Sequence, residues 1–444
     1  MEQANLTRKA PKRIAATVLG ALKGGVVPRV GLEYITVGRM QEIHALLHDV
    51  EIIRDGGAAF RFIVGQYGAG KSFLLQTIRN HVMDRLFVVL DCDLSPERRF
   101  CGTKGQGLAT YKELVRNMSV RTRPEGGALP LILDKWLNNI QTEIRMESPP
   151  ETEESQFEAA VSRKIFDVIR GMEDMVNGFD FGQAISRYYI ASKHGDDEAK
   201  SKVLRWFFGE YATKTEARQA LGINLIVNDD NWYDFLKLFS AFLVRAGYAG
   251  MYILVDELVN IYRIPHRTTR QYNYEKILAM YNDALQGKAH HIGILMSATP
   301  QCVEDTDKGI FSYDALKSRL TEGRFSTKGM RDLLAPIIRL EPLSHEEMMV
   351  LVEKLAALHA QLYDYNCDIA PEEYLAFLKT EFERIGAGIY LTPREIIRDF
   401  VELLNVLIQN PGKRIGDILQ DPAFEASKTP QPDETGAEFA AFEV

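Results

Sequence analysis

The chain has 444 residues, of which 46% are hydrophobic and 26% charged, a globular composition that argues against a disordered or a membrane-embedded chain. Its 53 Lys and Arg against 61 Asp and Glu give a formal net charge of −8, which argues against a protein that coats nucleic acid by bulk charge. Four cysteines, too sparse for a disulfide framework and spaced unlike zinc ligands, indicate a reducing compartment. We therefore expect a cytoplasmic protein without a membrane partner, since no apolar run approaches the ~20 residues of a membrane span.

The first 36 residues are predicted to form a basic helical arm. Residues 1–30 carry six Lys and Arg but only Glu2 as an acidic residue. Such an arm is either a solvated helix face or a contact surface for an acidic partner or nucleic acid, and the sequence leaves both interpretations open.

Five short β-type runs, each followed by a turn or helix signal, predict an α/β fold with a central parallel five-stranded sheet. The runs cover residues 60–64, 86–91, 251–255, 292–296 and 337–340. The long separation between the second and third runs is mostly helical. Apolar residues at three- and four-residue steps predict amphipathic helices over 133–144 and 161–172, inside a helical insertion at about 108–235.

A phosphate-binding loop follows the first predicted strand and fits the pattern G-x-x-x-x-G-K-[ST]. It consists of Gly65, Gln66, Tyr67, Gly68, Ala69, Gly70, Lys71 and Ser72, and Phe73 continues into an apolar helix. Glycines let backbone amides turn inward around a di- or triphosphate, and the helix N-terminus adds partial positive charge. Lys71 would neutralise the β- and γ-phosphate oxygens, and the Ser72 hydroxyl would bind Mg²⁺. The pattern predicts binding of ATP with Mg.

Two adjacent carboxylates end the third predicted strand. Asp256 and Glu257 follow an apolar run, and such sheets place their ligands at strand ends. Asp256 would join Ser72 in the Mg²⁺ shell, and Glu257 would orient and deprotonate a water that attacks the γ-phosphate. This pair favours hydrolysis over transfer to a bound acceptor, as in a small-molecule kinase.

Further candidate residues lie after the fourth strand. Thr299, preferred over Ser297, would contact the γ-phosphate or the attacking water, with a simple helix cap as the alternative. Arg319 or Arg324 would stabilise charge on the transferred phosphoryl group of a neighbour's nucleotide, with a surface salt bridge as the alternative fate, and Arg394 has similar standing.

These motifs, in this order, resemble an AAA+ ATPase of the origin-recognition type. More closely, the chain resembles the ATP-binding proteins of bacterial BREX phage-defence systems, of the BrxD type. The likeness spans about residues 10–420. It is carried by residues 25–28 (Gly-Val-Val-Pro), Val37-Gly38-Arg39, 67–72, 309–312, 315–320 and 338–344.

The resemblance implies an ATPase core at 37–342 and a helical lid at 343–420, and composition alone predicts a disordered acidic tail at 421–444. It also implies that the strand ending at Thr299 lies between the phosphate-loop strand and the Asp256 strand. Val37, Gly38 and Arg39 would lie near the adenine, and Arg394 would contact the γ-phosphate bound to its own subunit. Two departures stand out: Pro300 replaces an Asn common in AAA+ proteins, and an insertion separates Lys71 from Asp256.

The expected function is therefore that of an ATP-hydrolysing protein of an anti-phage defence system. It would form a homo-oligomer and couple nucleotide state to assembly, or to action on DNA or on other defence-system proteins. The alternative is an ATP-gated binding module that assembles a complex with little or no turnover, which would have nearly the same sequence.

Overall fold

A computed structural model describes residues 9–149, 151–321, 323, 331–384 and 392–419. Arg324 and the tail predicted at 421–444 lie outside the described residues. The chain divides into two compact units: unit 1 comprises residues 1–38 and 342–444, and unit 2 comprises residues 39–341.

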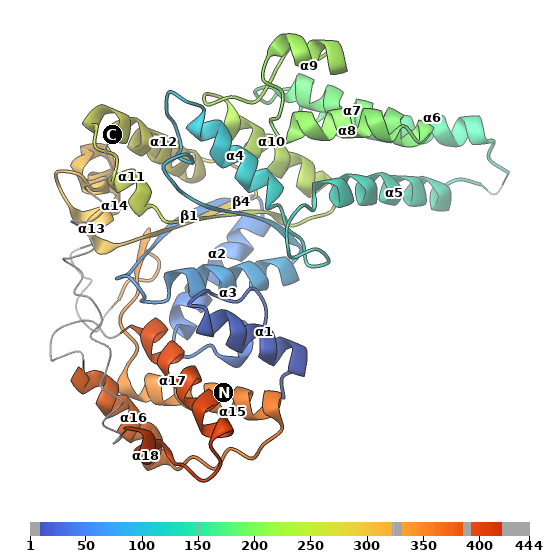
Figure 1. The fold of residues 1–444 in the computed structure, drawn as a ribbon. Coiled ribbons are helices and arrows are strands. Elements are labelled where there is room, and N and C mark those ends of the chain that lie inside the picture. Colours follow the sequence, from blue (N-terminus) through green and yellow to red (C-terminus); the bar gives the residue numbers. More distant parts are fainter. Residues whose placement is uncertain (1–8, 150, 322, 324–330, 385–391, 420–444) are drawn as a thin grey trace. The chain divides into compact units, whose positions relative to one another are not determined.

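Unit 2 is built on one sheet of five parallel strands (Figure 1). The strands are β1 (Ala58–Val64), β2 (Phe87–Asp93), β3 (Gly250–Asp256), β4 (Ile292–Ala298) and β5 (Ile337–Arg339). Their order in the sheet is β2-β3-β4-β1-β5. The predicted α/β class and parallel sheet of a P-loop NTPase are confirmed, and so is the position of β4 between the phosphate-loop strand and the strand that ends at Asp256.

Helices cover both faces of this sheet, so its strands are apolar on both sides. In β3, Tyr252 and Leu254 pack with α2 (Met40–Arg54) and α3 (Lys71–Asp84) in one apolar cluster. The alternate residues of β3 belong to a second, larger cluster on the other face, which includes the insertion. The remaining helices of unit 2 follow β3 and β4. They are α11 (Val259–Tyr262), α12 (Arg267–Leu285), α13 (Pro300–Glu304), α14 (Asp314–Leu320) and the 3-10 turn Ile310–Ser312.

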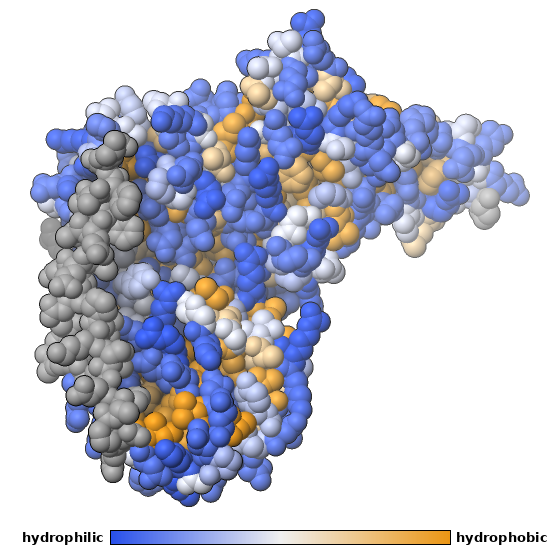
Figure 2. All heavy atoms as spheres, in the orientation of Figure 1, coloured by the Kyte–Doolittle hydropathy of each residue, from blue (hydrophilic) through white to orange (hydrophobic). Residues whose placement is uncertain are grey.

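The predicted helical insertion lies between β2 and β3. It contains α4 (Gln106–Arg116), α5 (Leu129–Glu147), α6 (Glu154–Arg170), α7 (Gly178–His194), α8 (Asp197–Phe207), α9 (Lys214–Leu221) and α10 (Trp232–Arg245). The two amphipathic helices expected from the sequence are α5 and α6. Phe181 joins α7 to its neighbours, with ring centroids 5.1 Å from those of Phe207 and Phe239. The outer surface of these helices is mostly hydrophilic with apolar patches (Figure 2).

Unit 1 is helical and combines both ends of the chain. Its elements are α1 (Lys12–Lys23), the 3-10 turn Leu32–Tyr34, α15 (His345–Tyr363), α16 (Pro371–Arg384), α17 (Pro393–Gln409) and α18 (Ile415–Leu419). Within the predicted basic arm, α1 packs on α15 and α17, and Lys12 forms an ion pair with Asp364. At the start of α17, the Glu395 carboxylate accepts hydrogen bonds from the backbone N–H and hydroxyl of Thr392, and the two residues form a capping box.

A buried histidine in α15 predicts a pH-dependent stability. Burial lowers the pKa of His359 below its ordinary value of 6.5, opposed by a hydrogen bond with Asn405. Because the unfolded chain then binds a proton that the folded chain does not, the free energy of unfolding falls as the pH drops through 6.5. We expect the free energy of unfolding, measured by chemical denaturation, to be lower at pH 5.5 than at pH 7.5. His359→Gln, although less stable throughout, lacks this part of the pH dependence, and an unchanged pH profile in this variant would contradict the assignment.

Of the helices that the structure describes, none has both the length and the apolar character needed to cross a membrane.

Candidate nucleotide-binding site

The phosphate loop connects the end of β1 to the start of α3. Gly68 and Gly70 have φ angles of 76° and 90°, in the left-handed region that favours glycine. A Cβ on Gly70 would meet no atom within 4 Å, so the backbone conformation, rather than crowding, requires glycine there. The loop thus brings the first amides of α3, whose first residue is Lys71, to the carboxyl edge of the sheet.

The Lys71 ammonium lies inside this loop. Its Nζ donates to the carbonyl oxygens of Gly65, at 2.9 Å, and Gln66, at 2.8 Å. Burial lowers the pKa of Lys71, and the charges of Asp256 and Glu257 oppose that shift. These two carboxylates thus act electrostatically on Lys71 although they are far from it in sequence.

Asp256 is held by three donors from three segments. Ser72 Oγ donates to Asp256 Oδ2 at 2.6 Å. The other carboxylate oxygen accepts hydrogen bonds from the Ser297 hydroxyl and, at 2.8 Å, from the backbone N–H of Glu257. Since β4 lies between β1 and β3, the ends of all three strands converge on this carboxylate. The phosphate loop and the predicted acidic pair therefore form a single site.

Glu257 takes a backbone conformation that is unusual for its residue type. Its φ angle is 59°, in the left-handed region, and its side chain is exposed. Strained non-glycine residues of this kind cluster at functional sites. The turn also separates the two adjacent carboxylates, since Asp256 is fixed by Ser72 while Glu257 is exposed to solvent.

Comparison with families of known proteins identifies the family of this chain. A family model described as BREX system ATP-binding protein BrxC/D matches residues 10–422. The chain belongs to this family. Membership confirms the predicted resemblance and the prediction of an ATP-binding protein of a phage-defence system, whereas the BrxD type stays a prediction because the description covers both. Comparison with curated proteins finds no match.

One carboxylate of this BrxC/D family member was missed by sequence reasoning. Asp93 ends β2 and is the register partner of Asp256 in β3. Partial burial raises the pKa of Asp93, and the charges of Asp256, Asp91 and Glu257 raise it further. The sequence contains a signal for Asp93, because the second β-run is followed by acidic residues within 91–93. Since parallel strands end at the same edge of a sheet, these residues could have been expected near Asp256.

Thr299 and Ser297, the two candidate hydroxyls after β4, have different partners. Thr299 caps α13, where its Oγ1 accepts a hydrogen bond from the backbone N–H of Cys302 at 3.3 Å. The Ser297 hydroxyl contacts Asp256, although Thr299 was preferred over Ser297 as the hydroxyl that acts at the γ-phosphate.

This difference predicts unequal effects of two substitutions. Ser297→Ala removes a donor that orients Asp256. If Asp256 is a Mg²⁺ ligand in ATP hydrolysis, the Mg²⁺ concentration giving half-maximal turnover should rise about tenfold, as is typical when a partner of a metal ligand is lost. Thr299→Ala removes a helix cap, costs about 1 kcal/mol of stability and leaves the Mg²⁺ requirement unchanged. Magnesium titrations of ATP turnover check this, and the reverse order of effects would contradict it.

Val37, Gly38 and Arg39 were expected near the adenine. Of these three residues, Arg39 contacts the phosphate loop. Its Nη2 donates to the Ala69 carbonyl at 3.2 Å and to the Glu341 carbonyl at 2.7 Å. Val37 and Gly38 belong to unit 1, where a Cβ on Gly38 would clash with the Glu347 carboxylate.

The predicted arginines have separate locations. Arg319 is exposed on α14 in unit 2 and donates to the Ala315 carbonyl at 2.7 Å. Arg394 lies in unit 1, at the start of α17, and donates to the Gly25 carbonyl.

The residues at the site fit a magnesium ion. Ser72 Oγ and the Asp256 carboxylate are oxygen donors already in contact, which is the ligand type that Mg²⁺ prefers. Within the described ranges, no group of three or more His, Cys, Asp and Glu forms a metal cluster. Two protein ligands suffice here, because Mg²⁺ in such sites also binds substrate phosphates and waters.

Proposed function

We propose that this chain is a magnesium-dependent ATPase of a bacterial anti-phage defence system. The observation that carries the proposal is the 2.6 Å hydrogen bond between Ser72 and Asp256, which joins the phosphate loop to the acidic pair across the sheet. Ser72 and Asp256 would hold Mg²⁺, which when bound neutralises charge on the β- and γ-phosphates. Lys71 would exchange its two loop carbonyls for phosphate oxygens, and the loop amides would bind the triphosphate.

Hydrolysis is favoured by the position of Glu257. Its exposed carboxylate follows a fixed metal ligand, so it can accept a proton from a water molecule while Asp256 keeps its place. Arg319 would act on the nucleotide of a neighbouring subunit in a homo-oligomer. This role is supported by its exposure and by the lack of an ion pair for Arg319 among the residues described. Arg324 is the alternative candidate for this role. As the resemblance implies, Val37, Gly38 and Arg39 would lie near the adenine. Arg394 would contact the γ-phosphate bound to its own subunit.

Motion at the site would reach the insertion through α3. Arg79, fully buried in α3, donates to Ser119 Oγ at 2.8 Å and to the Pro124 carbonyl, and it forms an ion pair with Asp91 at 3.4 Å. The 119–124 segment leads into α5. Nucleotide state could thus be transmitted to DNA or to other defence-system proteins, in a cytoplasmic setting that suits the four free cysteines.

The test is release of inorganic phosphate from Mg-ATP by the full chain. Turnover that requires Mg²⁺ supports the ATPase. Tight ATP binding with no phosphate release, combined with a change of mass on binding a non-hydrolysable ATP analogue, would instead favour the ATP-gated assembly module.

A further inference from the structure

A basic stretch directly follows the acidic pair. Residues 258–274 contain Arg263, Arg267 and Arg270 but no Asp or Glu, in a chain whose net charge is −8. This stretch forms α11 and the first turns of α12. Its charge therefore has the opposite sign to that of the whole chain, at the edge of the sheet where the nucleotide site lies.

Two other segments are fixed against the start of α12. The side chain of Asn273 accepts hydrogen bonds from the backbone N–H groups of Phe100, at 2.9 Å, and Cys101, at 3.1 Å. On another side, the Tyr274 hydroxyl donates to the Lys308 carbonyl at 2.6 Å. Hydrogen bonds to α12 therefore hold loops 98–105 and 305–309 against the basic stretch.

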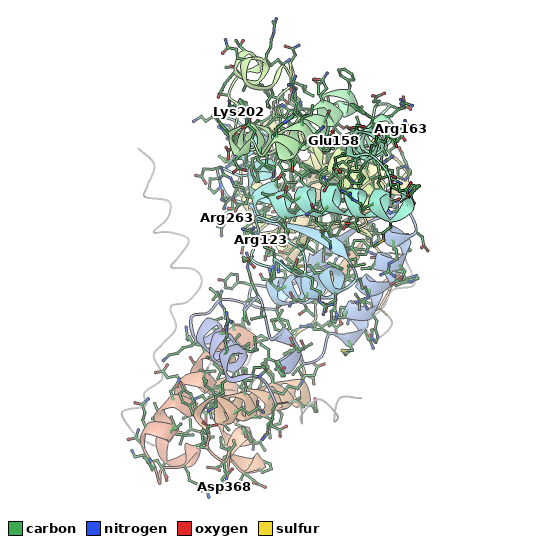
Figure 3. All side chains as sticks on the ribbon, turned by 90° about the vertical axis from the view of Figure 1, so that its right-hand side faces the viewer. Arg123, Glu158, Arg163, Lys202, Arg263 and Asp368 are labelled. Carbon is green, nitrogen blue, oxygen red and sulfur yellow. The ribbon has the colours of Figure 1, made fainter. Side chains whose placement is uncertain are left out.

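These three segments carry four exposed cations, which we name the basic face: Lys104, Arg263, Arg267 and Lys308. None of them forms an ion pair within the part of the chain that the structure describes, whereas cations of the insertion such as Lys164 and Lys193 do. Figure 3 shows Arg263 at the margin of unit 2, pointing to solvent.

The acidic groups beside the basic face do not cancel it. Asp305 accepts hydrogen bonds from the Tyr262 hydroxyl and from the backbone N–H groups of Asp307 and Lys308, which lower its pKa and keep it ionised. Asp305 and the exposed Asp307 thus place two negative charges beside the four cations, which still leaves a positive balance.

Helix α12 also carries an exposed aromatic ring. Tyr272, on α12 one turn after Thr268, is 55% exposed. Arginine forks match phosphate oxygens, and an exposed aromatic ring offers a surface on which a base can stack. An acidic polypeptide would use the cations but has no base to stack on Tyr272.

We propose that the basic face binds the phosphate backbone of nucleic acid, with Tyr272 contacting a base or sugar. The basic arm in α1 is the weaker candidate, because its helix is packed in unit 1 and Lys12 is paired with Asp364. The basic face would then be the surface through which the protein contacts DNA.

The basic face is also connected to the proposed catalytic carboxylate. Asn260 Nδ2 donates to the Leu94 carbonyl at 2.8 Å and to the Glu257 carbonyl at 3.3 Å. A ligand bound at Arg263 therefore lies on the segment whose first residues position Glu257. This part of the inference rests on the proposed ATPase function, whereas binding itself does not.

The test is fluorescence anisotropy of the full chain with labelled duplex and single-stranded DNA and RNA of about 30 nucleotides, at several salt concentrations. Arg263→Glu combined with Arg267→Glu should weaken binding at least tenfold. It should also reduce the slope of log affinity against log salt by about 2, one for each lost phosphate contact. Tyr272→Ala should weaken binding of single strands more than that of duplexes.

The matched control reverses the same number of charges on α9, by Lys214→Glu with Arg218→Glu, and should leave binding unchanged. Unaltered ATP affinity in the Arg263/Arg267 variant would exclude misfolding. The proposal is overturned if the wild type binds none of these nucleic acids at low salt, if poly-glutamate competes as well as DNA, or if charge reversal of Arg13 and Lys23 in α1 abolishes binding instead. If the wild type bound DNA but released no phosphate from ATP, the proposed ATPase activity would be rejected. The proposed binding of nucleic acid to the basic face would still hold.

Discussion

Lys71→Ala should lower the affinity for Mg-ATP about 100-fold or more. The substitution removes an ammonium group that is placed inside the phosphate loop and now donates to Gly65 and Gln66. Hydrogen bonds to charged groups contribute about 1.5–3 kcal/mol each, and two such contacts to phosphate oxygens exceed the ~2.8 kcal/mol that a 100-fold change requires. Isothermal titration calorimetry with a non-hydrolysable ATP analogue measures the effect directly.

Lys214→Ala, at an exposed position on α9, is the matched control and should bind as the wild type does. Thermal melting without nucleotide separates lost binding from lost folding. Full retention of nucleotide affinity in Lys71→Ala, with a folded protein, would be incompatible with a phosphate site in this loop.

Glu257→Gln should reduce the rate of ATP turnover by 10²–10⁴-fold while leaving ATP affinity within a few-fold of the wild type. General bases typically contribute a factor of this size, and glutamine keeps the shape of the side chain but cannot take a proton. Phosphate release gives the rate, and calorimetry gives the affinity. The combination of lost turnover and kept affinity is the signature of an interaction made only in the transition state.

The control for this prediction is Glu275→Gln, an exposed carboxylate on α12 of the same unit. It should leave both quantities unchanged. If Glu257→Gln turned over ATP as fast as the wild type, the water-activating role would be lost and the assembly module would become the better account. A parallel loss of affinity would point instead to a role in holding magnesium.

The local parts of the candidate site could be predicted from the sequence, because each depends on a short pattern. The loop from Gly65 to Ser72 needs glycines at fixed positions between a strand and a helix, and those requirements are readable without the fold. The predicted runs at 251–255 and 292–296 are apolar throughout, which is typical of parallel strands that are buried on both faces. The resemblance supplied the position of the fourth strand between the first and the third, which no local pattern contains.

Other features depend on tertiary contacts and could not be read from the sequence. Whether Ser297 or Thr299 reaches Asp256 depends on how far β4 extends, because Thr299 becomes a helix cap once the strand ends at Ala298. Asp93 joins the site only through its register with Asp256. The basic face is divided among segments around residues 104, 263–267 and 308, which only the packing around α12 brings together.

The most direct test of the central claim is an experimental structure of the full chain with Mg²⁺ and a non-hydrolysable ATP analogue. The account predicts that the triphosphate lies on the amides of residues 66–72 with Lys71 on the β- and γ-phosphates. Mg²⁺ should lie ~2.0–2.1 Å from Ser72 Oγ, with the Asp256 carboxylate bound to it directly or through a water molecule. A nucleotide bound elsewhere, or a bound nucleotide whose metal is remote from Asp256, would contradict the account.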